Sequence, residues 1–435
     1  MKSKSIVIII LISIAIVFLF LSFKAVNRAT AGPASVFASI TNISSPLIKY
    51  FFENIVKAIT KTPENEAIQK IETPKIVKAV YLTSWSAGYG FRVNYVINLA
   101  KTVGVNAVVI DIKDYSGYVA YDSKLPDVIN YNTKSVKIPN VSSLIKKLHK
   151  EGIYTIARIV VFEDPALAAA KNDWAIQSKN EFSFSSFLAA VASLWSDNLK
   201  LSWVDPASED VWNYNIAIAK EASALGFDEI NFDYVRFPSD GDLKNMSFPV
   251  WDGKTAKHLV IKKFFEKIRE SLPNDKLSVD LFGLTTVNSD DMGVGQVIED
   301  AFENFDYICP MIYPSHYSAG FLGYENPAQH PYEVVRYSME SANKRLAQYK
   351  EEIKKSNDAA RTSNKEISAK LRPWLQDFDM GAVYNVDMVK AEINASSQAL
   401  GQSYTGFMLW NASNVYHDSA IKSEIDNSPS PSPQG

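Results

Sequence analysis

The chain has 435 residues and a formal net charge of −3, which suits one large domain with appended segments. Of its 45 Lys/Arg and 48 Asp/Glu, nine and four lie in residues 1–75, which leaves 36 and 44 for residues 76–435. An acidic main region argues against nucleic acid as a partner. The single cysteine, Cys309, excludes an intramolecular disulfide.

The N-terminal region contains an uncharged apolar run, residues 5–23, which follows Lys2 and Lys4. About 18 or more apolar residues can span a bilayer, whereas the core of a cleaved signal peptide has about 7–15. We therefore expect residues 1–28 to form a single-pass membrane anchor, with the C-terminal domain outside the cell. Secretion after signal cleavage is the alternative. Residues 29–75 are expected to form a stalk, and residues 426–435 a Pro/Ser-rich tail that does not fold.

Strand-like and helical runs alternate between residues 76 and 425, as is typical of a parallel sheet wrapped by helices. The expected strands cover residues 76–83, 106–112, 153–162, 228–235, 277–282, 306–313, 371–376 and 404–410. The expected helices include residues 92–103, 141–151, 208–225, 254–272, 331–355 and 387–400. Eight units predict an α/β fold, a (β/α)₈ TIM barrel. An open doubly wound sheet is the competitor, but no Gly-rich dinucleotide motif follows the first strand.

Three connections after expected strands are long, at residues 113–140, 163–207 and 236–253. Long loops at the ends of barrel strands build active sites, and these loops are rich in aromatic residues. Together they favour a groove that binds a polymer. For any single ring, packing beneath the loop is the alternative.

The segment GFDEINFDYVRFP (226–238) alternates between two faces, with Asn231 and Asp233 on the face that would point into the barrel. Asp233 would lie at the mouth, where barrel enzymes place catalytic groups. A structural ion pair between Asp233 and Arg236 is the alternative interpretation.

The same alternation, applied strand by strand, predicts a polar barrel mouth. Asp111, Asp280, Tyr313 and Trp410 should join Asp233 there, with Asp114, Arg236 and His316 in the adjoining loops. Two carboxylates on neighbouring strands are what glycosidic cleavage requires, one ionised and one protonated. Spacing between them, which decides retaining or inverting chemistry, cannot be read from the sequence.

We expect Asp233 to be the ionised partner, because Arg236 nearby would hold its pKa down. Asp280 is the expected acid/base, with Glu163 and Asp377 as rivals, and Asp377 is also a candidate for substrate binding. The five histidines show no zinc spacing, so neither a metal nor a cofactor is expected.

Several segments resemble one family. They are VVIDIKDYSG (108–117), RIVVFEDP (158–165), WVDPAS (203–208), GFDEINFDYVRFPSDG (226–241), VDLFG (279–283), GVGQ (293–296), DYICPMIYPSHY (306–317), RPWLQDF (372–378) and FMLWNASNVY (407–416). Residues 76–420 are similar to the bacterial "putative glycosyl hydrolase domain" family. The resemblance implies a barrel glycoside hydrolase that acts on an extracellular or cell-envelope polysaccharide. A non-catalytic glycan-binding barrel tethered to the membrane is the alternative.

Chitinase-type barrels end their fourth strand with the pattern D-x-x-D-x-D-x-E. Here Val235 stands at the position of the acid, so a chitinase mechanism is not expected. The arrangement is more similar to amylase- or galactosidase-type barrels, whose nucleophile is an Asp that ends the fourth strand.

Overall fold

The computed structural model describes residues 68–179, 194–360 and 366–422. The expected anchor, residues 1–28, and the expected tail, residues 426–435, lie outside the described residues. Among the residues that are described, no helix is long and apolar enough to cross a membrane.

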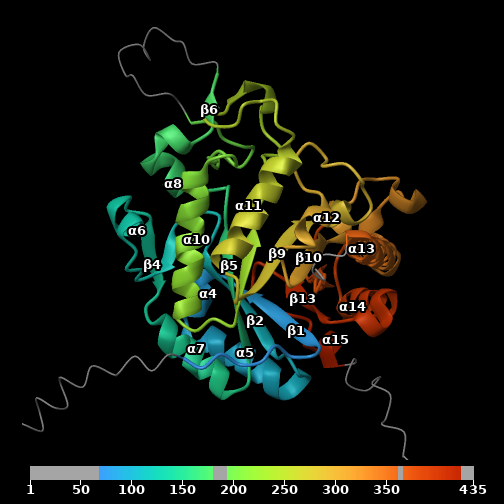
Figure 1. Cartoon of the computed structure of the whole chain (residues 1–435). Coiled ribbons are helices and arrows are strands. Elements are labelled where there is room, and N and C mark those ends of the chain that lie inside the picture. The colour runs from blue at the N-terminus through green and yellow to red at the C-terminus, as the bar shows by residue number, and fades with distance from the viewer. Residues whose placement is uncertain (1–67, 180–193, 361–365, 423–435) are drawn as a thin grey trace, which may run out of the picture. The chain divides into compact units, whose positions relative to one another are not determined.

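Eight parallel strands close into a barrel (Figure 1). Each strand pairs in parallel with the next, and the first strand pairs with both the second and the last, so the sheet has no open edge at the closure. This confirms the predicted (β/α)₈ architecture. The barrel strands are β1 (Val77–Leu82), β2 (Ala107–Lys113), β5 (Tyr154–Val160), β7 (Glu229–Asp233), β9 (Lys276–Phe282), β10 (Tyr307–Ile312), β12 (Trp374–Gln376) and β13 (Gly406–Trp410).

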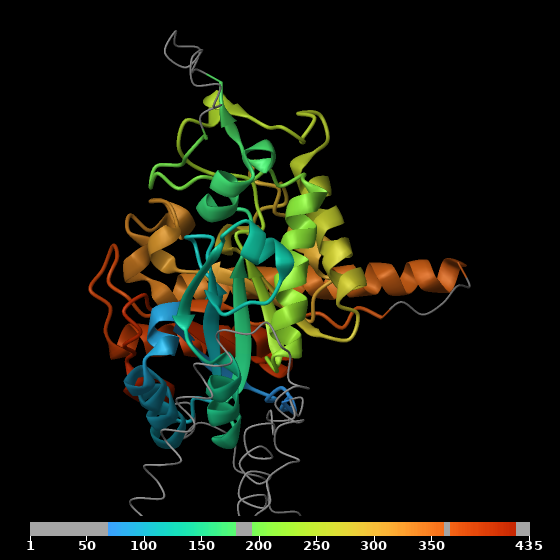
Figure 2. The ribbon, with the colours of Figure 1, turned by 90° about the vertical axis from the view of Figure 1, so that its left-hand side faces the viewer.

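The six predicted helices are present and cover the outside of the barrel (Figure 1). The long helix α13 extends past the barrel on one side (Figure 2). Between β9 and β10 the connection contains only η3 (Gly283–Thr286) and the short α12 (Ile298–Ala301), not a full helix. The helices are α5 (Gly90–Val103), α7 (Val141–Lys150), α10 (Glu209–Ala224), α11 (Lys257–Ser271), α13 (Pro331–Ala360) and α14 (Val386–Leu400).

Local sequence accounts for where the helices begin. Asn140 precedes α7, and its side chain accepts a hydrogen bond from the backbone N–H of Ser143, which satisfies one donor of the first turn. Ser208 caps α10 in the same way, through the N–H of Val211. One face of α7 is apolar and buried, so tertiary packing against the barrel stabilises the helix once the cap has set its start.

The strand residues alternate between two apolar layers. Residues such as Val80, Leu82 and Ile110 belong to the layer between strands and helices. Ala79, Tyr81 and their equivalents on the other strands fill the barrel interior. At the N-terminal ends of the strands, the lower end of the barrel, the interior also contains a buried ion pair between Glu229 and Arg372. The Arg372 guanidinium lies 4.1 Å from the centre of the Tyr307 ring. The interior is therefore a packed core rather than a pore, as in other barrels of this size.

The long loops carry structure of their own. Residues 113–140 contain β3 (Val119–Tyr121), α6 (Pro126–Asn130) and β4 (Lys134–Ile138), and β3 pairs antiparallel with β2. The loops after β5 and β7 meet through the antiparallel pair β6 (Gln177–Ser178) and β8 (Met246–Ser247), which lies at one end of the molecule (Figure 1).

Burial corrects part of the expected aromatic groove. Trp195 and Trp203 are buried, and Trp251 packs edge-on against Phe237 and Phe248. Trp195 and Trp203 therefore belong to the main hydrophobic core and Trp251 packs against it, so the three rings are not free to stack on a ligand.

Candidate active site

Asp233, the last residue of β7, points into the barrel mouth and is only 3% exposed. Its Oδ2 accepts hydrogen bonds from Nε of Arg158 at 3.1 Å and from Nη2 of Arg158 at 2.5 Å. Arg158 comes from the neighbouring strand β5, and its Nη1 donates to Oδ1 of Asp111 at 2.6 Å. The Arg158 guanidinium thus binds two carboxylates, one from each of the strands that flank β5, namely β2 and β7. Charge-assisted contacts of this kind are stronger than neutral hydrogen bonds, but at Asp111 burial outweighs Arg158 and raises the pKa of the carboxyl group.

The backbone turns sharply after Asp233. The next residue, Tyr234, has a φ of 53°, which is in the left-handed region that a bulky residue rarely adopts. Its N–H donates to Oδ1 of Asp233 at 2.6 Å. The strand therefore ends earlier than the expected residue 235, and the strained residue fixes the orientation of the carboxylate that precedes it.

Asp280 lies on β9, the other neighbour of β7, and is 1% exposed. Its Oδ1 accepts hydrogen bonds from Nε1 of Trp374 and from Nδ2 of Asn231, both at 2.8 Å. Its Oδ2 has no hydrogen-bond partner among the described residues and lies 3.8 Å from Nε of Arg158. Burial, and then the charge of Asp233, raises the pKa of Asp280 well above its usual value, so this carboxyl holds a proton that it can donate.

Nε of Arg158 lies near both acids, and its two distances set an upper limit on the distance between their Oδ2 atoms. Nε of Arg158 lies 3.1 Å from Oδ2 of Asp233 and 3.8 Å from Oδ2 of Asp280, so the two oxygens are at most 6.9 Å apart. The structure thus brings together two inward carboxyl groups in different surroundings: Asp233 is paired with Arg158, and Asp280 is buried with a raised pKa.

Aromatic rings enclose this pair. The Trp410 ring lies 5.0 Å from the Arg158 guanidinium and stacks on Tyr81 at 4.0 Å, and the Tyr81 hydroxyl donates to Oδ2 of Asp111 at 2.5 Å. Trp410 remains partly exposed. Its ring therefore covers the cation while keeping contact with solvent.

Tyr313 and His316 lie on the β10 side of the mouth. Burial, and then the charges of Asp280 and Asp233, raises the pKa of the Tyr313 hydroxyl, which agrees with its predicted position beside the two acids. The His316 ring lies edge-on to Tyr313 at 5.3 Å, and desolvation by the surrounding groups lowers its pKa. A neutral imidazole is therefore available at the edge of the mouth at neutral pH.

The expected ion pair between Asp233 and Arg236 is wrong. Among the described residues, the cation paired with Asp233 is Arg158. The Arg236 guanidinium instead lies over the rings of Trp203, Tyr234 and Phe282 at 4.7 to 5.0 Å. Because the chain turns at Tyr234, the arginine that is near in sequence is directed away from the carboxylate.

Two other predicted site residues are engaged elsewhere. Asp114 accepts hydrogen bonds from Lys137 at 2.6 Å and from Ser84 at 2.9 Å, so it ties β4 to the start of α4 (Ser84–Gly88). Asp377 is fully buried and is bound by His417, whose backbone N–H donates to Oδ2 at 3.0 Å and whose Nδ1 lies 2.5 Å from Oδ1. Both carboxylates therefore have structural partners.

Glu163 remains a second candidate for the acid. It lies three residues after the end of β5 and is 4% exposed. Its carboxylate forms no hydrogen bond or ion pair within the described part of the chain. Burial raises its pKa to about 8; the charges of Asp197 and Asp233 act in the same direction, and Arg236 acts against them. Glu163 can therefore also hold a proton at neutral pH.

Three members of the cluster were not predicted as site residues, namely Arg158, Tyr81 and Trp374. A signal for Arg158 was present, because it falls on the inward face of the strand IYTIARIVVF, in phase with Tyr154 and Ile156. A charged residue in the middle of a buried strand requires a partner. In the described ranges, no group of three or more His, Cys, Asp or Glu side chains is arranged to hold a metal ion.

Comparisons with known proteins give the family and support the fold. A family described as "Putative glycosyl hydrolase domain" matches residues 79–416. The chain resembles the structure of the PgaB (BpsB) glycoside hydrolase domain from Bordetella bronchiseptica at 14% identity and a TM-score of 0.51, over 80% of this chain and 98% of that one, which supports the fold. A hypothetical protein from Ruminiclostridium thermocellum is 39% identical, with a TM-score of 0.41, over 49% of this chain and 98% of that one. A search of curated proteins found no significant match.

Proposed function

The chain belongs to the "Putative glycosyl hydrolase domain" family, and from this premise we propose that it hydrolyses glycosidic bonds with Asp233 and Asp280 as the working pair. One observation carries the proposal: two inward carboxyl groups lie on adjacent strands, one paired with Arg158 and the other buried without a cation in hydrogen-bond contact. Glycosidases need this division between an ionised and a protonated carboxyl.

In the proposed mechanism, Asp233 is the ionised group that attacks the anomeric carbon, and Asp280 protonates the leaving oxygen. Retaining enzymes have carboxyl groups about 5–5.5 Å apart, and inverting enzymes about 6.5–9.5 Å. The two Oδ2 atoms lie at most 6.9 Å apart, which is at the short end of the inverting range, and on this basis retention is the proposed outcome. Arg158 orients Asp233, since it holds the carboxylate through two donors.

The proposed substrate is an extracellular or cell-envelope polysaccharide. Trp410, Tyr313 and His316 border the two acids and offer one ring face and two polar groups to a sugar. We also propose that residues 1–28 anchor the protein in the cell membrane with the barrel outside, with a cleaved signal as the alternative.

A different acid is the main alternative within this mechanism. Both oxygens of Asp280 are buried, and Oδ1 already accepts two hydrogen bonds. Glu163 carries no such bonds and has a pKa of about 8. If substrate reaches Asp233 from the loop side, Glu163 would protonate the leaving group.

The burial of the two aspartates favours the second candidate function, a barrel that binds glycans but does not cleave them. Asp233 and Asp280 are both nearly inaccessible to solvent. In that case the carboxylates and Arg158 would form a structural network, and Trp410 and Tyr313 would supply the sugar contacts.

The deciding experiment is a screen of the purified protein against α- and β-linked polysaccharides, with release of reducing ends as the readout. On a cleaved substrate, Asp233→Asn should lower kcat by about 10²-fold or more, because the attacking group is removed. Asp280→Asn and Glu163→Gln identify the acid, because the variant that lacks it should also show a large loss of kcat. The control is Asp387→Asn, an exposed aspartate in the first turn of α14, which should leave the rate unchanged.

The outcomes separate the candidate functions. Full activity in Asp233→Asn would remove this residue from the mechanism. Binding of a glycan without any turnover, unchanged in Asp280→Asn, would favour the binding module. If a product forms, its first anomer observed by NMR distinguishes retention from inversion.

A further inference from the structure

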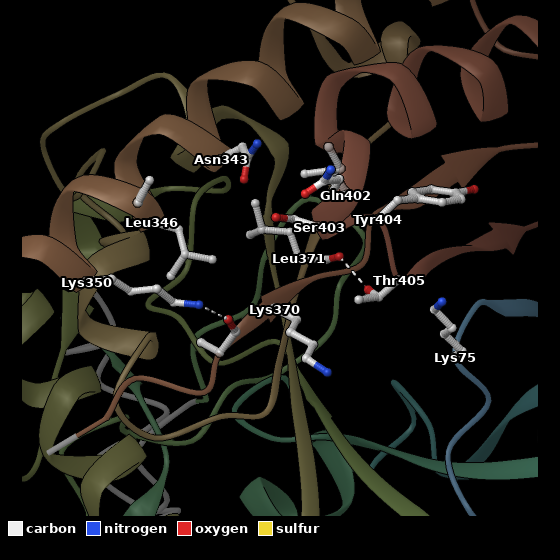
Figure 3. A pocket seen from close by; sticks show the side chains of 13 residues that line it. Lys75, Asn343, Leu346, Lys350, Lys370, Leu371, Gln402, Ser403, Tyr404 and Thr405 are labelled. Carbon is white, nitrogen blue, oxygen red and sulfur yellow. Dashed lines mark hydrogen bonds between the residues drawn. The ribbon is translucent and has the colours of Figure 1, made fainter. Parts of the chain in front are cut away.

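A pocket of about 330 Å³ lies away from the barrel mouth (Figure 3). Its lining comes from α13, from β11 (Lys370–Leu371), from the segment Gln402–Thr405 that leads into β13, and from Lys75 just before β1. These segments are at the N-terminal ends of the strands, whereas Asp233 is at the C-terminal end of β7. The pocket therefore belongs to the opposite end of the barrel from the candidate active site, and its volume is that of a small ligand site.

The pocket is lined by three lysines, Lys75, Lys350 and Lys370, and by no acidic residue. Among the described residues, Lys75 and Lys370 form no ion pair, and Nζ of Lys350 donates to the backbone carbonyl of Ala369 at 3.0 Å. Burial, and then the charge of Lys370, lowers the pKa of Lys350, while Glu366 acts in the opposite direction. The lining therefore carries three cations and no acidic group, and a bound anion would offset the repulsion between Lys350 and Lys370.

The rest of the lining is mixed in a way that suits a sugar. Figure 3 shows the three lysines along one side of the pocket, with Asn343 and Gln402 on the other. Leu346 and Leu371 supply apolar surface between them. Amide and hydroxyl groups hydrogen-bond sugar hydroxyls, and apolar side chains pack on the C–H faces of the ring.

We propose that this pocket binds an anionic carbohydrate, a sugar unit that carries a phosphate or a carboxylate group. The lysines bind the anionic group, and Asn343, Gln402 and Ser403 bind the hydroxyls. The proposal does not depend on hydrolysis at the barrel mouth, and it stands or falls separately from the proposed function.

Isothermal titration calorimetry on the purified protein tests the proposal, with glucose 6-phosphate, glucuronate, inorganic phosphate and neutral glucose as probes. At least one of the two anionic sugars should bind at 1:1 stoichiometry and more tightly than glucose or phosphate alone. Added NaCl should weaken this binding because the contacts are ionic. Lys350→Gln and Lys370→Gln should each weaken it roughly tenfold, the loss expected when one charge-assisted hydrogen bond is removed.

The control variant is Lys344→Gln, an exposed lysine on the same helix that does not line the pocket. It should leave the affinity unchanged. Since Lys350 is partly buried, the exposed Lys370 also serves as a charge-reversal variant, Lys370→Glu, whose melting temperature is checked first. Equal binding of glucose, equal binding of phosphate alone, equal weakening in Lys344→Gln, or no binding of either anionic sugar would each overturn the proposal.

Discussion

The buried Arg158 makes a strong prediction about stability. Arg158→Met removes three hydrogen bonds and leaves the carboxylates of Asp233 and Asp111 in the barrel interior without their cation. Breaking a buried ion pair by removing one partner costs about 3–5 kcal/mol, because the remaining charge stays desolvated. Unfolding entropy is about 2.1 cal/mol/K per residue, so for the compact unit from Ala67 to Gly435 this loss lowers Tm by roughly 4–6 °C.

The assay is thermal unfolding followed by circular dichroism, with two further variants. Arg336→Met is the matched control, since Arg336 forms an exposed i,i+4 pair with Glu340 on α13, and such surface pairs contribute little to stability. The triple variant Arg158→Met/Asp233→Asn/Asp111→Asn should recover part of the lost stability, because it removes the stranded charges. If Arg158→Met lowers Tm no more than Arg336→Met does, or if the triple variant has no higher Tm than Arg158→Met, the Arg158 guanidinium does not stabilise the two buried carboxylates as the geometry indicates.

Three other predictions follow from the same contacts. Folding raises the pKa of Glu163 from 4.5 to about 8, so between these values the folded protein keeps a proton that the unfolded chain has lost. Tm should therefore fall as the pH rises from about 5 to about 8, and it should fall less steeply in Glu163→Gln. Parallel plots of Tm against pH for the two proteins would contradict this prediction. If Asp280 is the acid, kcat should decline at alkaline pH as its raised pKa is passed, and a profile unchanged in Asp280→Asn would assign that limb to another group. Asp377→Asn should lower Tm through its contacts with His417 and leave kcat nearly unchanged, whereas a loss of activity at unchanged Tm would return Asp377 to the site.

The barrel and the inward carboxylates could be predicted because both depend on simple periodicities. Alternation of two residues within each strand is enough to place Asp233, Asp280 and Asp111 on the interior face, and the structure finds them there. The same rule, applied to residues 371–376, also separates Asp377 from the site. Trp374 belongs to the inner layer, so Asp377, three residues later, falls in the phase of the outward-facing Leu375.

The partner of Asp233 could not be predicted from proximity in sequence. Arg236 is three residues away, but the left-handed conformation of Tyr234 redirects the chain between them. The actual partner, Arg158, is 75 residues away and becomes a neighbour only through pairing of β5 with β7. The burial of Trp195 and Trp203 was equally hidden, since irregular loops have no periodicity that separates packed rings from exposed ones.

Burial of charge alone does not identify the active site, because the described part of the domain contains other fully buried ion pairs, such as Lys113 with Asp164 and Arg372 with Glu229. At the lower end, Glu229 and Arg372 are both fully buried, and Glu229 also accepts a hydrogen bond from Tyr154 at 3.1 Å. That pair is closed in by aromatic rings. At the upper end, the Arg158 cluster adjoins the partly exposed ring of Trp410.

Well-packed apolar residues often match or exceed the stability of a buried ion pair, so neither cluster is explained by stability alone. What distinguishes the upper cluster is an excess of acids. Arg158 is one cation among three aspartates, and the third, Asp280, stays neutral only because its pKa is raised. A single cation needs only one carboxylate to balance its charge. Stability therefore does not require the additional acid, Asp280, beside Asp233, whereas glycosidic cleavage requires a second, protonated carboxyl group.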